Sequence, residues 1–208
     1  NKITGLFNNV SPMQLVFATN NLNKLKEVQV LIPASIKLLS LKDIGCLEDI
    51  PETQNTIEGN AIQKAEYIKL HYGYNCFADD TGLEVPILHG EPGVYSARYA
   101  GPQRDADDNM NLLLEKLKDK TNRQAQFKTV IALHLDGELK TFTGICKGNI
   151  TKEKHGEHGF GYDPIFKAEG NTKTFAELPL EEKNQIGHRG KAVGQLVDYL
   201  NTLTNQYT

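Results

Sequence analysis

Tryptophan is absent from the sequence and cysteine is scarce, with only Cys46, Cys76 and Cys146 among 208 residues. Three widely spaced cysteines, an odd number, indicate neither a disulfide framework nor a CxxC metal site. We therefore expect a reducing compartment, the cytoplasm. Long apolar runs are also missing, since none approaches the roughly 18 residues that a membrane span needs. No membrane partner is expected.

An excess of basic residues is likewise absent. Lysine and arginine number 23 against 26 acidic residues, which gives a formal net charge of -3. Proteins that bind nucleic acid usually carry a basic excess gathered on one face. The charge balance therefore argues against a nucleic-acid partner.

The start of the chain is not expected to be a secretory signal. Residues 1–12 lack the apolar core and the small-residue cleavage site of a secretory signal. We predict that 1–12 form an N-terminal extension outside the fold. The remaining length suits a single domain, which we place at 13–208.

The most informative stretch is 76–83, where an apolar run leads into Asp79, Asp80, Thr81 and Gly82. We expect a buried strand to end here and both acids to leave the core, because an unpaired buried carboxylate is very costly. Ligands bind at the carboxyl ends of strands in open α/β sheets, and adjacent carboxylates there favour Mg²⁺ held with a phosphorylated substrate. An ordinary strand-to-turn transition would explain the same residues.

A second polar stretch, 19–24, follows the short apolar run 15–18 and precedes apolar residues at helical spacing that end before Pro33. This pattern predicts a strand, a turn and a helix. The free N–H groups of the first helical turn, together with Lys24, would cradle a phosphate. An ordinary capped helix is the alternative, and the glycines of a Walker loop are missing.

Apolar spacing and turn signals predict the other elements. Asp136-Gly137 lies between two alternating stretches and is a strong hairpin signal. Asn60 and Lys64 share a face of one predicted helix, and Arg98 is a potential anion-binding residue in a loop. The predicted strands are 35–39, 125–135 and 139–145. The predicted helices are 57–72, 188–203 and one that apolar residues mark over 110–117, with its cap at Asp105 or Asp107. Together they favour an α/β protein with a mixed sheet.

The final third of the chain carries a second dense patch. Phe160, Tyr162 and Asp163 stand among glycines that let the backbone approach a ligand closely. His188 and Arg189 fall at the first turn of the last predicted helix, where cations oppose the helix dipole. Their placement is costly unless they bind a ligand.

Taken in chain order, these motifs resemble those of the inosine triphosphate pyrophosphatases, which hydrolyse non-canonical purine nucleoside triphosphates. Each motif is weak alone, but their ordered combination is specific and spans nearly everything after Met13. The matching segments are 19–24, 51–53, 60–64, 78–83, 92–98, 160–164, 182–184 and 188–189.

The resemblance implies an elongated mixed β-sheet flanked by helices, with two lobes around a central nucleotide cleft. It also implies a homodimer that uses Mg²⁺ to hydrolyse ITP, dITP and XTP to the monophosphate and pyrophosphate, which removes deaminated purines from the nucleotide pool. Three alternatives stay open: hydrolysis of other modified nucleotides, release of orthophosphate, and a sensor that binds nucleotide without hydrolysis.

The resemblance further implies roles for single residues. Asp80 would be the general base and, with Glu52, a metal ligand. Arg189 or a protonated His188 would satisfy the 6-oxo group of the base, so that ATP, with an amino group there, is rejected. The substrate-binding residues that it implies are Thr19, Asn20, Asn21, Leu22, Asn23, Lys24, Lys64, Thr81, Phe160, Gly161, Tyr162, Asp163, Lys183, His188 and Arg189.

Overall fold

The computed structural model describes residues 12–205. The extension predicted at 1–12 therefore lies outside the described residues, except for its last position. The strands are β1 (Met13–Phe17), β2 (Ile36–Leu39), β3 (Cys76–Glu84), β4 (Pro92–Gly93), β5 (Gln124–Leu135), β6 (Glu138–Ile150) and β7 (Phe166–Ala168). The α-helices are α1 (Leu22–Gln29), α2 (Ile57–Tyr72), α3 (Ala106–Lys116), α4 (Leu180–Ile186) and α5 (His188–Asn205). Within this part of the chain, no helix has both the length and the apolar character needed to cross a membrane.

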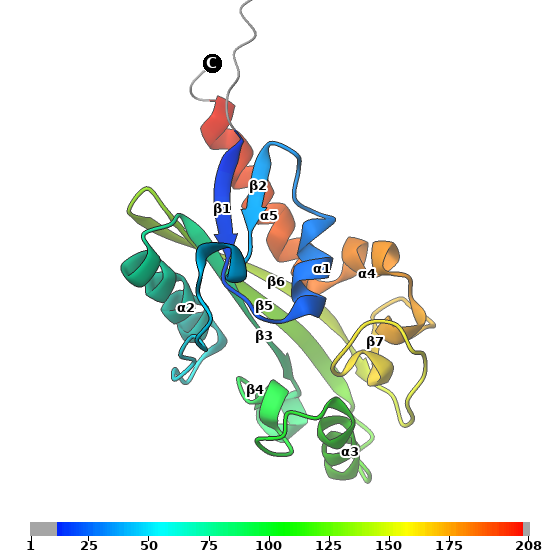
Figure 1. Ribbon diagram of the computed structural model, residues 1–208. Coiled ribbons are helices and arrows are strands. Elements are labelled where there is room, and N and C mark those ends of the chain that lie inside the picture. Colours follow the sequence, from blue (N-terminus) through cyan, green and yellow to red (C-terminus); the bar gives the residue numbers. More distant parts are fainter. Residues whose placement is uncertain (1–11, 206–208) are drawn as a thin grey trace, which may run out of the picture.

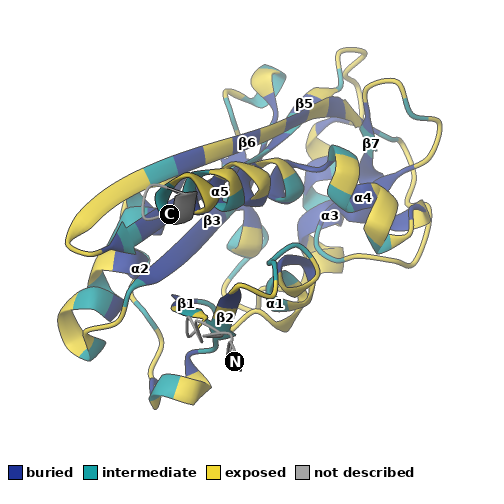
Figure 2. Ribbon diagram, turned by 90° about the horizontal axis from the view of Figure 1, so that it is seen from above, coloured by how far each residue is buried: buried dark blue, intermediate teal, exposed yellow. Residues whose placement is uncertain are grey.

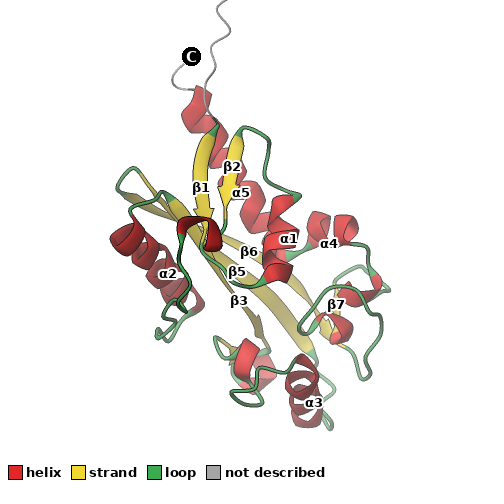
Figure 3. Cartoon of the chain, viewed as in Figure 1, coloured by secondary structure: helices red, strands yellow, loops and turns green. Residues whose placement is uncertain are grey.

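A single mixed sheet forms the frame of the molecule, as predicted. Its strand order is β2-β1-β3-β5-β6-β7, with β4 added to β3. β1 is parallel to β2 and to β3, whereas β3, β5, β6 and β7 pair antiparallel in succession. The long strands β3, β5 and β6 run diagonally past the end of β1 (Figures 1 and 3). The predicted fold class, a mixed α/β sheet flanked by helices, is confirmed.

The register of β3 corrects one prediction. β3 pairs with β1 only through Cys76 and Phe77, and from Ala78 onward it continues against β5. The strand therefore does not end at the two acids: Asp79 is 1% exposed and Asp80 is 9% exposed. The expectation that both leave the core is wrong because the burial of Asp79 is offset by ion pairs, which are described below. It is the neighbouring strand β1 that ends beside them.

Helices cover both faces of the sheet where β1 and β3 pair. Successive residues of a strand point to opposite faces, and β1 follows this rule. Leu15 and Phe17 pack with residues of α1 and α5, while Val16 and Ala18 pack with residues of α2. In Figure 2 α5 lies along β6 and β3, and the part of β3 beside it is buried. This region forms one lobe with a core on each side of the sheet.

The second lobe has a core of its own. It packs α3 and β7 against the far ends of β5 and β6, with Leu113, Phe127 and Phe166 among its buried residues. β5 contributes to all three cores, since Phe127 belongs to this one and Val130 and Ile131 belong to the other two. The predicted division into two lobes is therefore present, and the β5–β6 hairpin joins them.

The predicted hairpin is confirmed, since β5 and β6 pair antiparallel on either side of Asp136 and Gly137. Asp136 and Gly137 both have positive φ, 51° and 83°, as a two-residue type I′ turn requires. On β6 the exposed residues include Leu139 and Ile145. Gly144 lies on the opposite, buried face of β6, where an added Cβ would stand 2.0 Å from the His188 carbonyl oxygen of α5.

Candidate active site

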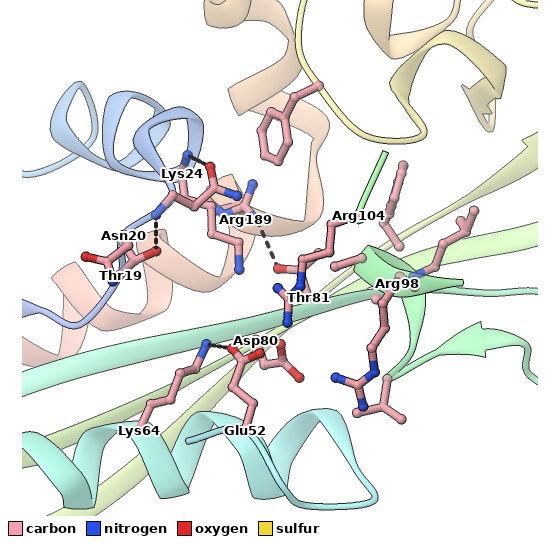
Figure 4. Close-up of a pocket in the computed structure, with 18 of the residues that line it drawn as sticks. Thr19, Asn20, Lys24, Glu52, Lys64, Asp80, Thr81, Arg98, Arg104 and Arg189 are labelled. Carbon is pink, nitrogen blue, oxygen red and sulfur yellow. Dashed lines mark hydrogen bonds and ion pairs between the residues drawn. The ribbon is translucent and has the colours of Figure 1, made fainter. Parts of the chain in front are cut away.

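A cavity of about 560 Å³ is lined by residues of both lobes. Asp80, Lys24 and Arg189 all line it, so the three charged groups expected to share one site do so (Figure 4). Of the predicted site residues, those that line the cavity are Thr19, Asn20, Asn21, Lys24, Glu52, Lys64, Asp80, Thr81, Phe160, Tyr162, Asp163, Lys183, His188 and Arg189. Leu22, Asn23 and Gly161 are not among the lining residues.

The turn after β1 leads into α1, which begins as an ordinary capped helix. The Asn21 side chain accepts hydrogen bonds from the backbone N–H groups of Asn23 at 3.0 Å and Lys24 at 3.2 Å. Thr19 Oγ1 in turn accepts from the Asn21 N–H at 3.0 Å. These amides are therefore committed to the cap rather than free for a phosphate, as the predicted cradle required. What the turn does deliver to the cavity is the Lys24 ammonium.

Asp79 is the buried counter-charge of the site. Its Oδ1 pairs with Lys24 Nζ at 3.1 Å, and its Oδ2 pairs with Arg189 Nε at 3.0 Å. Burial opposes its ionisation, but Lys24, Arg189 and Lys64 outweigh burial and hold the pKa of Asp79 well below its usual range. Asp79 is thus a permanent anion that keeps two cations in position.

Asp80 has the opposite environment. Burial, with help from the nearby charges of Glu52 and Asp79, raises its pKa to about 6, although Lys64 and Lys24 act against the rise. Its Oδ2 is buried and has no hydrogen-bond partner among the described residues. A carboxylate with a raised pKa and a free oxygen in a cavity has the properties of a general base.

Glu52 and Lys64 stand beside Asp80. Lys64 Nζ lies 2.8 Å from Glu52 Oε1 and donates to the Asp79 carbonyl oxygen at 2.5 Å. Residues 12–205 contain no group of three or more acidic, histidine or cysteine side chains that could hold a metal ion. Two carboxylates are nevertheless enough for Mg²⁺, which usually keeps waters and binds substrate phosphates as well. The unpartnered Asp80 Oδ2 makes Asp80 and Glu52 a fitting pair.

On the other side of the cavity, Glu27 joins two cations. Its Oε1 pairs with Lys183, and its Oε2 accepts from Arg189 Nη1 at 2.6 Å. Lys183 also reaches Asp163 Oδ2 at 2.7 Å and faces the Phe160 ring, with its Nζ 4.8 Å from the ring centroid. Arg189 is therefore neutralised by the protein itself, which corrects the expectation that its position needs a ligand.

His188 does not carry the charge that was considered for it. Its ring stacks on Phe127, with centroids 4.5 Å apart and an angle of 20°. Burial, reinforced by the charges of Arg189 and Lys183, lowers the pKa of His188 well below its usual value. A protonated His188 is therefore excluded as the hydrogen-bond donor to the 6-oxo group of the base. The imidazole enters the cavity wall as a neutral group, and its Nδ1 lacks a hydrogen-bond partner within residues 12–205.

Sequence reasoning missed several residues of the site. Glu27 follows Lys24 by three positions, so helical spacing could have placed the two on one side of α1. Nothing in the local sequence indicates that this glutamate is buried, at 3% exposure. Arg104 also lines the cavity, but it lies in an irregular segment without a recognisable motif.

Comparisons with known proteins agree with this geometry. The profile of the Ham1 family matches residues 15–199. The chain is 67% identical over 188 residues to a dITP/XTP pyrophosphatase of Flavobacterium johnsoniae, an alignment that covers 90% of this chain and 98% of the relative. It is 44% identical over 187 residues to the dITP/XTP pyrophosphatase of Bacillus subtilis, covering 88% and 94%.

Solved structures give the same result. The Ham1 protein of Staphylococcus aureus matches with a TM-score of 0.84 at 42% identity, over 91% of this chain and 98% of that one. A HAM1 protein from Coxiella burnetii matches with a TM-score of 0.85 at 38% identity, over 91% and 99%. Sequence and structure therefore agree that this chain belongs to the Ham1 family.

Proposed function

We propose that this protein hydrolyses deaminated purine nucleoside triphosphates, such as dITP and XTP, to the monophosphate and pyrophosphate. Relatives of up to 67% identity carry the name dITP/XTP pyrophosphatase. The observation that carries the proposal is that Asp80, Lys24 and Arg189 line a single cavity. Its volume, about 560 Å³, lies in the range of small-molecule sites.

In the proposed reaction, Asp80 is the general base. Its free carboxylate oxygen takes a proton from a water molecule as the water oxygen bonds to phosphorus. The P–O bond between the α- and β-phosphates breaks, and pyrophosphate leaves with the electron pair. Lys24 and Lys64, each held in place by a buried hydrogen bond or ion pair, stabilise the negative charge on the phosphoryl oxygens.

Mg²⁺ is part of the proposal, with Asp80 and Glu52 as its protein ligands. When bound, it would polarise the phosphoryl oxygens and lower the pKa of an attacking water. Glu52 already has Lys64 as a partner at 2.8 Å, so the pair of carboxylates is balanced by a cation before the metal enters. We further propose that the protein is a cytoplasmic homodimer.

We propose that the part of the cavity around Phe160 binds the purine base and distinguishes one purine from another. An aromatic face stacks on any base and contributes roughly 1–3 kcal/mol without discriminating. Discrimination requires hydrogen bonds, and Arg189 presents only donors. A 6-oxo group accepts from such donors, whereas the 6-amino group of adenine would leave two donors face to face. We therefore expect ITP, dITP and XTP to be accepted and ATP to be rejected.

The test is a panel of triphosphates assayed with Mg²⁺ and with EDTA, scored for rate and for product by chromatography. Rapid release of pyrophosphate from dITP and XTP, and little from ATP, is expected only with Mg²⁺. Orthophosphate as the product, or faster turnover of another modified nucleotide, would replace the proposal by one of its alternatives.

A variant separates catalysis from binding. Asp80→Asn removes the base but keeps the shape of the side chain, so turnover should fall on the order of 10²-fold or more while dITP still binds. Asp49→Asn, on the cavity rim, is the matched control and should retain activity. Near-normal turnover by Asp80→Asn would remove Asp80 from the mechanism, and an inactive wild type that binds dITP would identify a sensor.

A further inference from the structure

The chain has four arginines, and two of them already donate several hydrogen bonds within the protein. Arg123 donates to the carbonyl oxygens of Ile150, Leu117 and Thr151, each at 2.8 Å. Arg189 donates to two carboxylates and a hydroxyl. Arg98 and Arg104 differ, because both line the cavity and neither side chain makes a hydrogen bond or ion pair with any described residue.

Among the cations around the cavity, Arg98 and Arg104 differ from the others in having no carboxylate partner among the described residues. Lys24 is paired with Asp79 and Lys64 with Glu52. Lys183 is paired with Asp163 and Glu27, and the latter also pairs with Arg189. Every other cation of the wall thus has a carboxylate partner before substrate binds. The substrate brings the several negative charges of a triphosphate, which calls for cations that have no partner yet.

The backbone that presents Arg98 is held by side-chain hydrogen bonds on both sides. Ser96 Oγ accepts from the Leu83 N–H at 2.9 Å and donates to the Gly93 carbonyl at 2.6 Å, which fastens the turn to β3. Asn109, 3% exposed, donates to the Ala97 carbonyl at 3.0 Å. It also accepts from the N–H of residue 100 at 2.8 Å.

Two more contacts fix the same segment. The Tyr162 hydroxyl donates to the Ser96 carbonyl at 2.6 Å and thereby ties it to the other wall of the cavity. At Gly82, directly after Thr81 on β3, an added Cβ would stand 2.4 Å from the Gly93 carbonyl oxygen. The segment therefore packs as close to β3 as a backbone can. A fixed backbone on either side of Arg98 lowers the cost of placing its guanidinium against an anion.

The position of the two arginines indicates which part of the substrate they meet. In Figure 4 Arg98 lies across Asp80 and Thr81 from Lys24, and the Arg104 side chain extends toward Thr81 from that same side, so cations flank the proposed reaction centre. Phe160, the proposed base-stacking ring, belongs to the other wall, where it faces Lys183 and Arg189. Cations on the side of the reaction centre away from the base would contact the β- and γ-phosphates, which leave as pyrophosphate.

We propose that Arg98 and Arg104 bind the β- and γ-phosphates of the substrate and stabilise pyrophosphate as it departs. This inference rests on the proposed function. It assigns to the segment 93–104 the recognition of the triphosphate tail, separately from the base wall. Its consequence is selectivity for triphosphates over monophosphates, which lets the nucleotide product leave once the tail is cut off.

The test measures binding of three ligands, each with Mg²⁺: dITP, pyrophosphate and dIMP. The variants are Arg98→Ala, Arg104→Ala and the conservative Arg98→Lys, all in the Asp80→Asn background so that dITP is not consumed. Lys118→Ala removes one exposed positive charge outside the cavity and is the control. Titration calorimetry gives the dissociation constants, and circular dichroism with thermal unfolding verifies the fold.

Each alanine variant should weaken binding of dITP and pyrophosphate about tenfold or more, with dIMP changed less than about twofold. Arg98→Lys should weaken binding by an intermediate amount, because the lysine ammonium is a point charge whereas the guanidinium can donate two parallel hydrogen bonds. Unchanged pyrophosphate binding overturns the assignment for that arginine, and so does an equal loss for dIMP and dITP. Wild-type protein that releases no pyrophosphate from dITP would refute the proposed function instead, which keeps the two failures distinct.

Discussion

At the scale of single residues, Asp79 and Asp80 are neighbours in sequence with opposite chemistry. Adjacent strand residues point to opposite faces of a sheet. Asp79 points to the face covered by α1 and α5, where it forms ion pairs with Lys24 and Arg189. Asp80 faces the side of α2, where Lys64 is already paired with Glu52. Two carboxylates whose environments push their pKa values apart can serve as a structural anion and a base.

The raised pKa of Asp80 makes a prediction about stability. Its value in the folded protein is about 6, above the value of about 4 in an unfolded chain. The stabilising contribution of the protonated side chain is fully present below pH ~4 and is lost as the pH rises through about 6. Asp80→Asn does not titrate, so in EDTA it should gain up to about 3 kcal/mol over wild type between pH 4 and pH 8.

Urea unfolding of both proteins at the two pH values measures this difference. A wild type as stable as the variant at pH 8 would mean that the Asp80 carboxylate is not costly to ionise.

Glu27 supports a second prediction at this scale. Its carboxylate contacts both Lys183 and Arg189, and all three side chains are at most 5% exposed. Glu27→Gln leaves a buried excess of positive charge, which should cost on the order of 3–5 kcal/mol of unfolding free energy. The exposed Glu115→Gln should change stability by less than about 0.5 kcal/mol. Equal urea midpoints for the two variants would contradict the role given to Glu27.

At the scale of elements, the start of α5 depends on a glycine of β6. An added Cβ at Gly144 would stand 2.0 Å from the His188 carbonyl oxygen and 2.7 Å from the Ala192 nitrogen. The first turn of α5 carries His188 and Arg189 into the cavity. The close approach of helix and strand therefore sets where these two side chains lie.

Gly144→Ala should displace the first turn of α5 and cost about 1–3 kcal/mol of stability. It should also reduce dITP turnover, because a small misplacement of positioned groups is costly to catalysis. Gly194→Ala on the same helix meets no atom within 4 Å, and it should be neutral or stabilise by up to about 1 kcal/mol. Thermal unfolding and kcat/KM of both variants decide the matter, and equal effects would refute the packing argument.

At the scale of the whole molecule, the cavity belongs to both lobes. Lys24 and Lys64 come from the lobe with β1, while Arg98 and Tyr162 come from the lobe with α3. A ligand in the cavity therefore adds contacts between two separately packed cores. Ligand binding should be visible as stability of the whole chain.

We expect dITP at about 100 times its dissociation constant to add roughly 2.7 kcal/mol to the free energy of unfolding. The Asp80→Asn variant with Mg²⁺ is used to prevent turnover, and ATP at the same concentration should add much less. Calorimetric unfolding measures both. Equal stabilisation by ATP would show that selection occurs in the chemical step and not in binding.

Much of this molecule follows from local patterns. The Asp136-Gly137 turn and the helix over 57–72 were predicted and are present, because each depends on residues close to one another in the chain. The resemblance to the inosine triphosphate pyrophosphatases is confirmed by relatives named dITP/XTP pyrophosphatase. The roles of single site residues, Mg²⁺ and the homodimer stay predictions.

The amino-acid sequence by itself determined the elements, the family and most of the residues around the cavity. Only the tertiary structure decided which charges neutralise one another. Glu27 meets a lysine and an arginine more than 150 positions away, and Asp79 stays buried because Arg189 arrives 110 positions later. Helical and strand periodicity report which side of an element a residue occupies. They do not report which distant side chain the fold brings opposite to it, and ion pairs, pKa values and buried acids all depend on that.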